Sequence, residues 1–283
     1  MTPTPSLHRS ESEMNHSRIP SQYSTGTSRT DIERALLAAG KDLGQLHIAD
    51  LAMLEDYHTS GRIATSQLAD LIAIAPDSAV LDAGTGIGGT ARYLVDRFRC
   101  RVTGVDMVED YCGTARWLNR LVGLDDRIEV RRADVTALPF ADATFQVVFS
   151  QHVQMNIADK NGFYREMRRV VEDGGRLALW DIVSAGVVGE PDYPLPWADT
   201  ADQSHLATRD SLRGMIEAAG FGIEHWEDLT EQAVATMRMV QALPPSPLGL
   251  HAFVPDFRTR AENLTAALAD GRLQAIRAVA EAV

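Results

Sequence analysis

Short runs of strand-forming residues alternate with helical segments over much of this chain, which leaves few folds open to it. From Ala79 onward the strand-like runs read AVLDAG, RVTGVD, RIEVRRAD, FQVVFS and RLALWDI, and helical segments cover about 89–97, 111–121 and 160–171. Such alternation is typical of a parallel sheet with helices on both faces, because parallel strands need a crossover connection. We therefore predict an α/β, doubly wound, mostly parallel, Rossmann-like sheet.

The segments on either side of this core are predicted to be mostly helical. TDIERALLAAG carries Thr30 and Glu33 as a capping box and Gly40 as a helix stop, and further helices are expected over about 48–57 and 64–74. After the core, a Pro-rich connection precedes a helix over about 209–219, a sixth strand-like run (GIEHWEDL) and helices interrupted by LPPSPLG. The final IRAVAEAV, within residues 276–283, is either a helix or a seventh strand, because Ala and Val have opposite preferences.

We divide the chain into four parts. Residues 1–29 are rich in Ser, Thr, Pro and His and lack the apolar run of a secretory signal, so we predict a disordered leader. Residues 30–75 are expected to form an N-terminal helical lid and residues 76–230 the Rossmann-like core. Residues 231–283 are expected to form a helical C-terminal extension that contributes the last strand if IRAVAEAV is extended.

Charge and cysteine content exclude several classes of partner. The formal net charge of −12 argues against the basic surface of a protein that binds nucleic acid or an anionic membrane. Two cysteines are too few for a disulfide framework, and no apolar run approaches the length of a membrane span. We expect a cytoplasmic protein that acts on a small molecule, binds neither nucleic acid nor membrane, and contains no metal site; a homodimer is left open.

A glycine-rich loop, VLDAGTGIGG, joins the first strand to the next helix and carries Gly84, Gly86 and Gly89 as GxGxxG. This arrangement holds a nucleotide-like ligand against a helix N-terminus. Asp82 decides between two ligands: a carboxylate here repels the pyrophosphate of a dinucleotide but suits a ligand that carries an ammonium and a sulfonium. The charge therefore favours S-adenosylmethionine over NAD.

Two more acids follow the second and third strands. Asp106 ends VTGVD, where a carboxylate can accept hydrogen bonds from both ribose hydroxyls, although dinucleotide enzymes also use an acid there. Asp134, in RRADVTALPF, is placed to meet an adenine amino group. Acids at three successive strand ends predict a ligand crevice at the carboxyl edge of the sheet.

The segments VLDAGTGIGGTARYL, VTGVD, RRADVTALPF and EMRRVVEDGGRLALWD resemble the successive motifs of class I S-adenosylmethionine-dependent methyltransferases. DYHTSGRIAT and SQHVQMNIADK resemble small-molecule members, of the sarcosine and dimethylglycine N-methyltransferase and the ubiquinone-type and sugar O-methyltransferase kinds. The resemblance, which covers about 57–229, implies a seven-stranded sheet and S-adenosylmethionine as cofactor, with S-adenosylhomocysteine as product. The residues expected to contact the cofactor are Tyr57, Asp82, Gly84, Thr85, Gly86, Asp106, Met107, Asp134, Val135, Ser150 and Gln151.

The acceptor side is expected around SQHVQMNIADK, which follows the fourth strand. His152 is the candidate general base, because its ordinary pKa lies near working pH, but it could equally hydrogen-bond a backbone group. Asp181, which closes LALWD, could orient that base, bind the acceptor or cap a turn. The residues expected to bind the acceptor are His58, Gln154, Asn156, Trp197 and His205.

We therefore predict a methyltransferase of class EC 2.1.1 that acts on nitrogen or oxygen of a small metabolite. Two alternatives stay open: methylation of carbon on a quinone-like or other electron-rich ring, and an NAD-dependent oxidoreductase. A protein that binds the cofactor without catalysis would also fit the crevice.

Overall fold

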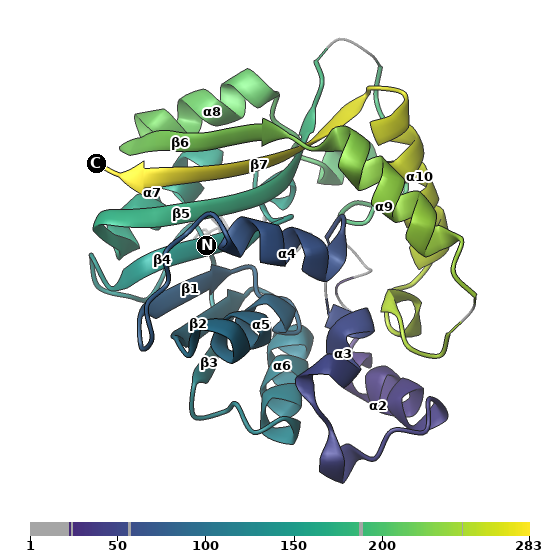
Figure 1. Cartoon of the computed structure of the whole chain (residues 1–283). Coiled ribbons are helices and arrows are strands. Elements are labelled where there is room, and N and C mark those ends of the chain that lie inside the picture. The colour runs from purple at the N-terminus through teal and green to yellow at the C-terminus, as the bar shows by residue number, and fades with distance from the viewer. Residues whose placement is uncertain (1–22, 24, 56–57, 187–188, 245) are drawn as a thin grey trace, which may run out of the picture.

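The computed structural model describes residues 23, 25–55, 58–186, 189–244 and 246–283 (Figure 1). Most of the predicted leader, residues 1–22 and 24, lies outside the described residues, and so does Tyr57. Within the described chain, the predicted α/β fold is confirmed: one seven-stranded sheet has the order β3-β2-β1-β4-β5-β7-β6.

The strands occur where the sequence alternation placed them. They are β1 (Ala79–Ala83), β2 (Arg101–Asp106), β3 (Ile128–Arg132), β4 (Phe145–Gln151), β5 (Val171–Ser184), β6 (Phe221–Asp228) and β7 (Leu273–Ala282). The first five are parallel, whereas β7 pairs antiparallel with both β5 and β6. The segment left open as helix or strand is thus a strand, and its residues such as Ala278 and Val279 are buried between two neighbours.

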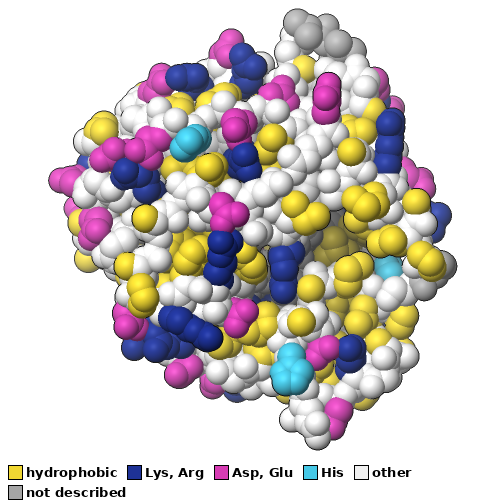
Figure 2. Space-filling model, in the orientation of Figure 1, with side chains coloured by type: hydrophobic (Ala, Val, Ile, Leu, Met, Phe, Trp, Pro, Cys, Tyr) yellow, Lys and Arg dark blue, Asp and Glu magenta, His cyan; other side chains and the backbone are white. Residues whose placement is uncertain are grey.

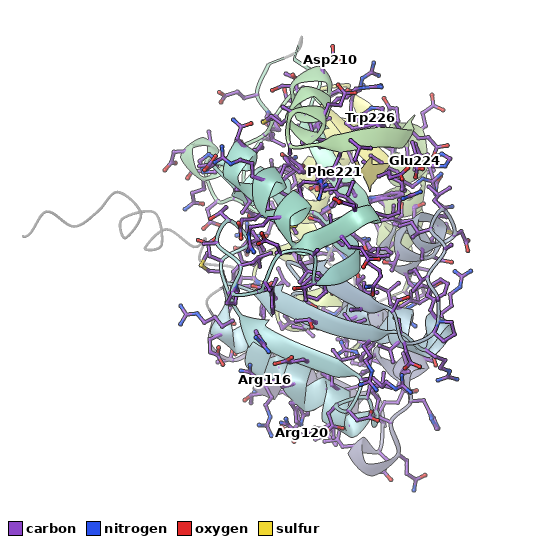
Figure 3. The ribbon with its side chains drawn as sticks, turned by 90° about the vertical axis from the view of Figure 1, so that its left-hand side faces the viewer. Arg116, Arg120, Asp210, Phe221, Glu224 and Trp226 are labelled. Carbon is purple, nitrogen blue, oxygen red and sulfur yellow. The ribbon has the colours of Figure 1, made fainter. Side chains whose placement is uncertain are left out.

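Helices cover both faces of this sheet. They are α4 (Gly61–Ala69), α5 (Gly89–Phe98) and α6 (Glu109–Leu121) on one face, and α7 (Lys160–Val170) and α8 (Arg209–Ala218) on the other. Figure 3 shows the molecule from the side, with Asp210 of α8 and Arg116 of α6 at opposite ends of the view.

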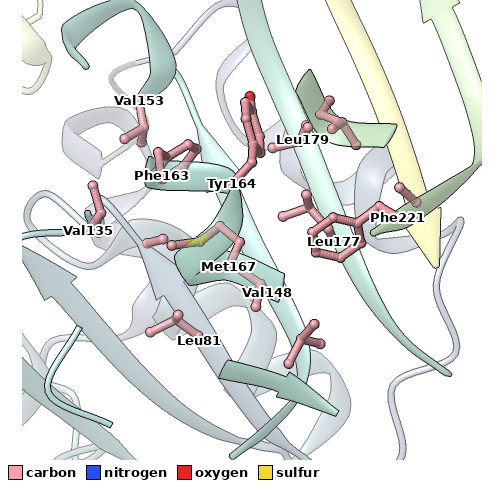
Figure 4. Close-up of a cluster of buried hydrophobic side chains, with 14 of the residues drawn as sticks. Leu81, Val135, Val148, Val153, Phe163, Tyr164, Met167, Leu177, Leu179 and Phe221 are labelled. Carbon is pink, nitrogen blue, oxygen red and sulfur yellow. The ribbon is translucent and has the colours of Figure 1, made fainter. Parts of the chain in front are cut away.

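Successive residues of one strand pack against opposite layers, as the pleat of a strand requires. Val80 belongs to the cluster under α4, α5 and α6, whereas its neighbour Leu81 belongs to the cluster under α7 and α8. Figure 4 shows this second layer, where Phe163 and Met167 of α7 pack in the cluster that contains Leu81. These two apolar layers fix the carboxyl ends of β1, β2 and β4 in place.

The remaining helices gather beside the carboxyl edge of the sheet. The helices α2 (Ser28–Ala38) and α3 (Ile48–Glu55) bury Leu36 and Leu54 in one cluster with Trp117 of α6 and the short helix η6 (Leu250–Ala252). The helices α9 (Thr230–Gln241) and α10 (Phe257–Ala269) pack with the Pro-rich connection that follows β5. The helices expected at both ends of the chain are therefore present.

A buried arginine joins α10 to the Pro-rich connection. The side chain of Arg260 is only 3 % exposed, and its Nη2 lies 2.5 Å from Oδ1 of Asp199. Its Nη1 donates to the carbonyl oxygen of Leu195 at 2.7 Å, and its Nε donates to that of Pro255 at 3.0 Å. One guanidinium thus connects two positions of the Pro-rich connection with the turn that precedes α10.

The capping-box prediction is wrong. Helix α2 begins at Ser28, so Thr30 lies inside the helix. The helix extends towards its N-terminus because the backbone N–H and the hydroxyl of Ser28 both donate to Oδ2 of Asp110 on α6, at 3.2 and 2.5 Å. A tertiary contact therefore sets this boundary. Gly40, with φ of +72°, does follow the end of the helix as predicted.

Candidate active site

A cavity of about 470 Å³ lies at the carboxyl ends of β1, β2 and β4. Its volume is in the range usual for cofactor and small-ligand sites. The structure brings most of the predicted site residues to this cavity: His58, Asp82, Gly84, Thr85, Gly86, Asp106, Met107, Asp134, Val135, Gln151, His152, Asn156, Trp197 and His205. Ser150, Gln154 and Asp181 are not among its lining residues.

The glycine loop forms a tight bend between β1 and α5. Gly84 has φ of +82°, and a Cβ built on it would lie 2.3 Å from Cγ2 of Val153, so no larger residue fits without movement. Gly86 has φ of +53°, and a Cβ built there meets no atom within 4 Å. Its backbone N–H donates to Oδ2 of Asp106 at 2.9 Å. The loop thus presents bare backbone to the cavity, as close approach of a nucleoside ligand requires.

Asp82 is the acid at the floor of this bend. It is 3 % exposed and accepts a hydrogen bond of 2.6 Å from the hydroxyl of Thr85. Burial, and less strongly the nearby charge of Asp106, raise the pKa of Asp82 to about 6, although the hydrogen bond from Thr85 acts in the opposite direction. A positively charged ligand would relieve the repulsion between these two acids.

Asp106 and Asp134 complete the acidic side of the cavity. Asp106 accepts from the N–H groups of Gly86 and Val108, both at 2.9 Å, and burial raises its pKa. Asp134 accepts from the N–H and the hydroxyl of Thr136 at 2.8 and 2.7 Å. Local hydrogen bonds therefore fix both carboxylates in place. Among the described residues that line the cavity there is neither Lys nor Arg.

This arrangement fits S-adenosylmethionine better than a dinucleotide. The acids and the open glycine loop suit a nucleoside with a cationic tail, whereas a diphosphate would face carboxylates, and none of the described lining residues is Lys or Arg. The residues that would hold the tail are Asp82 and Gly84, and Asp106 and Asp134 would hold the nucleoside.

A polar network borders the cavity beside the glycine loop. Oε1 of Gln151 accepts from the hydroxyl of Thr90 at 3.1 Å, and its Nε2 lies 3.1 Å from Nε2 of His58. Burial lowers the pKa of His58 to about 4. His58 is therefore neutral at physiological pH, and its Nδ1 lies 3.4 Å from the carbonyl oxygen of Thr59.

His152 stands directly after β4 with φ of +56°, in the left-handed region that residues other than glycine rarely adopt. Strain of this kind tends to be kept at functional sites. Its Nε2 accepts from the backbone N–H of Thr59 at 3.3 Å and lies 3.2 Å from the Thr59 hydroxyl, which in turn accepts from the indole N–H of Trp180 at 2.8 Å. Burial and the neighbouring His58 hold the pKa of His152 well below its usual value, so the ring is neutral.

Asp181 lies in β5, away from the cavity lining, and is 1 % exposed. Burial raises its pKa well above the ordinary value, while the nearby Lys160 acts in the opposite direction. Gln154, also absent from the lining, donates from Nε2 to the carbonyl oxygen of Ile182 at 2.6 Å, and Ser150 is completely buried. These three residues therefore support the wall of the cavity and do not form its surface.

Several residues that line the cavity were not predicted from the sequence. Tyr23, in the predicted leader, reaches the cavity and stacks edge-on against Tyr111 at 6.0 Å between ring centroids. Burial raises the pKa of Tyr23, and its hydroxyl is within hydrogen-bonding range of Asn156. Phe253, next to η6, also lines the cavity. No motif marks these aromatic residues, because they reach the site only through the tertiary fold.

The described residues contain neither a metal-binding cluster nor a membrane-spanning helix. No group of three or more His, Cys, Asp or Glu side chains in the described part of the chain could hold a metal ion. None of the helices in the described ranges has the length and apolar character needed to cross a bilayer.

Comparison with known proteins shows that the chain is similar to methyltransferases. A family model described as a methyltransferase domain matches residues 81–179. The chain is 32 % identical over 159 residues to a sarcosine/dimethylglycine N-methyltransferase of Halorhodospira halochloris, covering 56 % of this chain and 57 % of that one. It is 28 % identical over 189 residues to the methyltransferase GfsG of Streptomyces halstedii, covering 66 % and 68 %. The chain thus spans about two thirds of these relatives or less.

The fold has a close counterpart among solved structures. A geranyl diphosphate C-methyltransferase from Streptomyces coelicolor A3(2), in complex with S-adenosylhomocysteine, superposes with a TM-score of 0.71. The match covers 99 % of this chain and 100 % of that one at 17 % identity. At this identity the likeness shows a shared fold and no more.

Proposed function

Because the chain carries a class I S-adenosylmethionine-dependent methyltransferase domain, we propose that it transfers the cofactor's methyl group to a nitrogen or oxygen atom of a small-molecule metabolite. The observation that carries this proposal is the acidic cavity: Asp82, Asp106 and Asp134 surround an open glycine loop, and no Lys or Arg stands among the described lining residues. S-adenosylmethionine supplies a methyl group already activated on a sulfonium.

Positioning is the main contribution of this protein. Holding two reactants in attack geometry can supply about 7–11 kcal/mol, whereas a positioned base adds about a hundred- to ten-thousand-fold in rate. The carboxylates of Asp82 and Asp106 and the glycine loop fix one reactant, and the segment after β4 offers polar groups to the other. Tyr23 and Phe253 add aromatic surface to the same cavity.

His152 is proposed to receive the proton of the acceptor. A base must be unprotonated, and burial keeps this imidazole neutral. In the free protein its Nε2 already accepts a long hydrogen bond of 3.3 Å from Thr59, which an acceptor hydroxyl or amine would have to replace or share. Asp181, which is not on the cavity surface, would act only through the backbone that holds His152.

The acceptor atom distinguishes the main proposal from its alternative. Relatives named as N-methyltransferases and neighbours named as C-methyltransferases both occur, so carbon methylation is the second candidate. Carbon methylation of an electron-rich ring would need the same base if the ring carries a hydroxyl. An NAD-dependent oxidoreductase is disfavoured, because Asp82 would face a diphosphate.

The test uses methyl-labelled S-adenosylmethionine with an extract of small metabolites and mass spectrometry of the labelled product. With that product in hand, His152→Ala is expected to lower turnover by about a hundred- to ten-thousand-fold and to leave S-adenosylhomocysteine affinity nearly unchanged. His225→Ala, on the exposed edge of β6, is the matched control. Unchanged turnover in His152→Ala would remove this residue from the mechanism.

A further inference from the structure

We propose that the methyl acceptor is a molecule with a largely apolar body, which carries a hydroxyl or amine but neither phosphate nor carboxylate. This inference rests on the proposed function and concerns the part of the cavity beyond the glycine loop. We call this part the acceptor chamber; it is lined by Ile157, Ala158, Asp159, Pro196, Trp197, Asp202, Gln203 and His205.

The charge of the acceptor chamber disfavours an anion. Asp159 and Asp202 are its only formally charged lining residues among those that the structure describes. Both carboxylates already accept local hydrogen bonds, Asp159 from the N–H of Gly162 at 2.8 Å and Asp202 from the hydroxyl of Thr200 at 2.7 Å. A phosphate or carboxylate entering here would meet like charge from these two exposed carboxylates, and none of the described chamber residues is a Lys or Arg that could offset it.

Histidines do not supply the missing positive charge. His152 and His58 are buried and neutral, as described above, and burial also lowers the pKa of His205. The nearby charge of Lys160 lowers that pKa further. At neutral pH the imidazoles around the chamber therefore offer hydrogen bonds without a net charge.

Two cations near the chamber, Lys160 and Arg260, already make other hydrogen bonds. Nζ of Lys160 donates to the carbonyl oxygens of Ile157 and His205, and burial lowers its pKa to about 8. The guanidinium of Arg260 is bound to Asp199 and to the carbonyl oxygen of Leu195. Neither side chain is part of the chamber lining, and recruiting either one would break buried hydrogen bonds.

The walls of the chamber are suited to an apolar body. Ile157, Ala158 and Pro196 present aliphatic carbon, and the indole N–H of Trp197 is used internally by a 2.9 Å hydrogen bond to the hydroxyl of Ser204. What Trp197 can offer a ligand is therefore ring carbon. Such a lining stabilises apolar groups, and these side chains offer a phosphate neither a positive charge nor a hydrogen-bond donor.

Apolar surface is also exposed on helices that do not contribute to the cavity lining. Figure 2 shows a hollow bordered by hydrophobic side chains in the region where Figure 1 places α3, α4 and α9. These helices carry large hydrophobic residues that are half exposed, Met53 at 51 %, Ile63 at 50 % and Met239 at 60 %.

The test compares two probes that share one apolar body, 1-naphthol and 1-naphthyl phosphate. Each is titrated by calorimetry into the full-length protein saturated with S-adenosylhomocysteine. We expect 1-naphthol to bind about tenfold or more tightly than its phosphate. Equal affinity, tighter binding of the phosphate, or binding of neither probe would overturn the inference.

A charge reversal tests whether the chamber itself makes the distinction. Asp202→Lys should strengthen binding of 1-naphthyl phosphate about tenfold and leave 1-naphthol nearly unchanged. The control is Asp125→Lys, an exposed turn acid at the opposite edge of the sheet, which should change neither affinity. An equal gain in both variants would place the effect in the overall charge of the protein and contradict the inference.

The same titrations separate this inference from the proposed function. Failure of S-adenosylhomocysteine to bind would overturn both. If it binds but the phosphate is preferred, only the acceptor class is wrong, and the methyltransferase proposal stands.

Discussion

Replacing Asp82 by Asn should stabilise the free protein and weaken its binding of S-adenosylmethionine. The carboxyl is buried beside Asp106, and its pKa is about 6 instead of the ordinary 3.8. A carboxyl whose pKa is higher in the folded than in the unfolded protein destabilises the fold when it is ionised. The penalty is absent below about pH 3.8, grows as the pH rises, and is complete above about pH 6.

The size of this penalty follows from the pKa difference. About two pKa units, each about 1.36 kcal/mol, amount to about 3 kcal/mol at pH 7.5. The side-chain oxygen of Asn can still accept a hydrogen bond from Thr85, but its nitrogen cannot accept one from the N–H of Ala91. The loss of that second hydrogen bond reduces the stabilisation by about 1 kcal/mol. We therefore expect a net stabilisation of about 2 kcal/mol and a rise in Tm of about 4–8 °C.

Thermal unfolding of the cofactor-free protein at pH 7.5 and pH 5 measures this effect. At pH 5 the wild-type carboxyl is largely protonated, so the advantage of Asp82→Asn should fall below about 1 kcal/mol. Calorimetry should show at least about tenfold weaker binding of S-adenosylmethionine, because the variant no longer offers a negative charge to the cationic tail. Asp126→Asn, in an exposed turn, is the matched control.

Two results would refute this reasoning. A lower Tm at both pH values would mean that the hydrogen bond from Thr85 outweighs the buried charge. Unchanged affinity for S-adenosylmethionine would mean that Asp82 does not face the cationic part of the cofactor.

Three further substitutions test the packing around the site. Gly84→Ala should destabilise the fold by about 1–3 kcal/mol in urea unfolding, because its φ is positive and the new methyl group would meet Val153; wild-type stability would contradict the tight bend. Arg260→Ala should cost about 2–4 kcal/mol in the same assay, because Asp199 and buried carbonyl groups lose their donor; a loss below about 1 kcal/mol would show that water replaces it. Tyr23→Ala should weaken S-adenosylhomocysteine binding about two- to tenfold in calorimetry without lowering Tm; unchanged affinity would place Tyr23 outside the cofactor site.

Local patterns were sufficient to predict most of the core. A parallel strand followed by a helix buries its apolar residues in a recognisable period, so β1 to β5 and α5 to α7 lie where the sequence placed them. The secondary structure of residues 276–283 could not be predicted from such a pattern. Their Ala and Val residues fit either structure, and only pairing with β5 and β6 makes them a strand.

The acids of the site were predictable because strand ends in a parallel sheet share one edge. Asp82, Asp106 and Asp134 each follow a legible strand, and all three line the cavity. Asp181 was expected at a strand end as well, but β5 continues to Ser184, and Asp181 is not among the residues that line the cavity. Side chains alternate between the two faces of β5. The sequence alone does not tell which of these residues face a ligand.

Contributions from distant segments could not be inferred. Tyr23 precedes the first core strand by more than fifty residues and reaches the cavity through the packing of α2 against α6. Thr59, which donates its backbone N–H to His152, lies in a loop whose path depends on α4. Such contacts depend on how whole helices dock, and single-sequence periodicity carries no information on docking.

The position of β7 constrains how the sheet can be assembled. β6 is made earlier on the ribosome than residues 273–282, yet within the described sheet it is hydrogen-bonded to β7 alone. Until those residues emerge, β6 and α8 have no strand that links them to β5. The unit formed by α8 and β6 must therefore wait for this segment, and a nascent chain stopped before residue 273 would expose the unpaired edge of β5 to other chains.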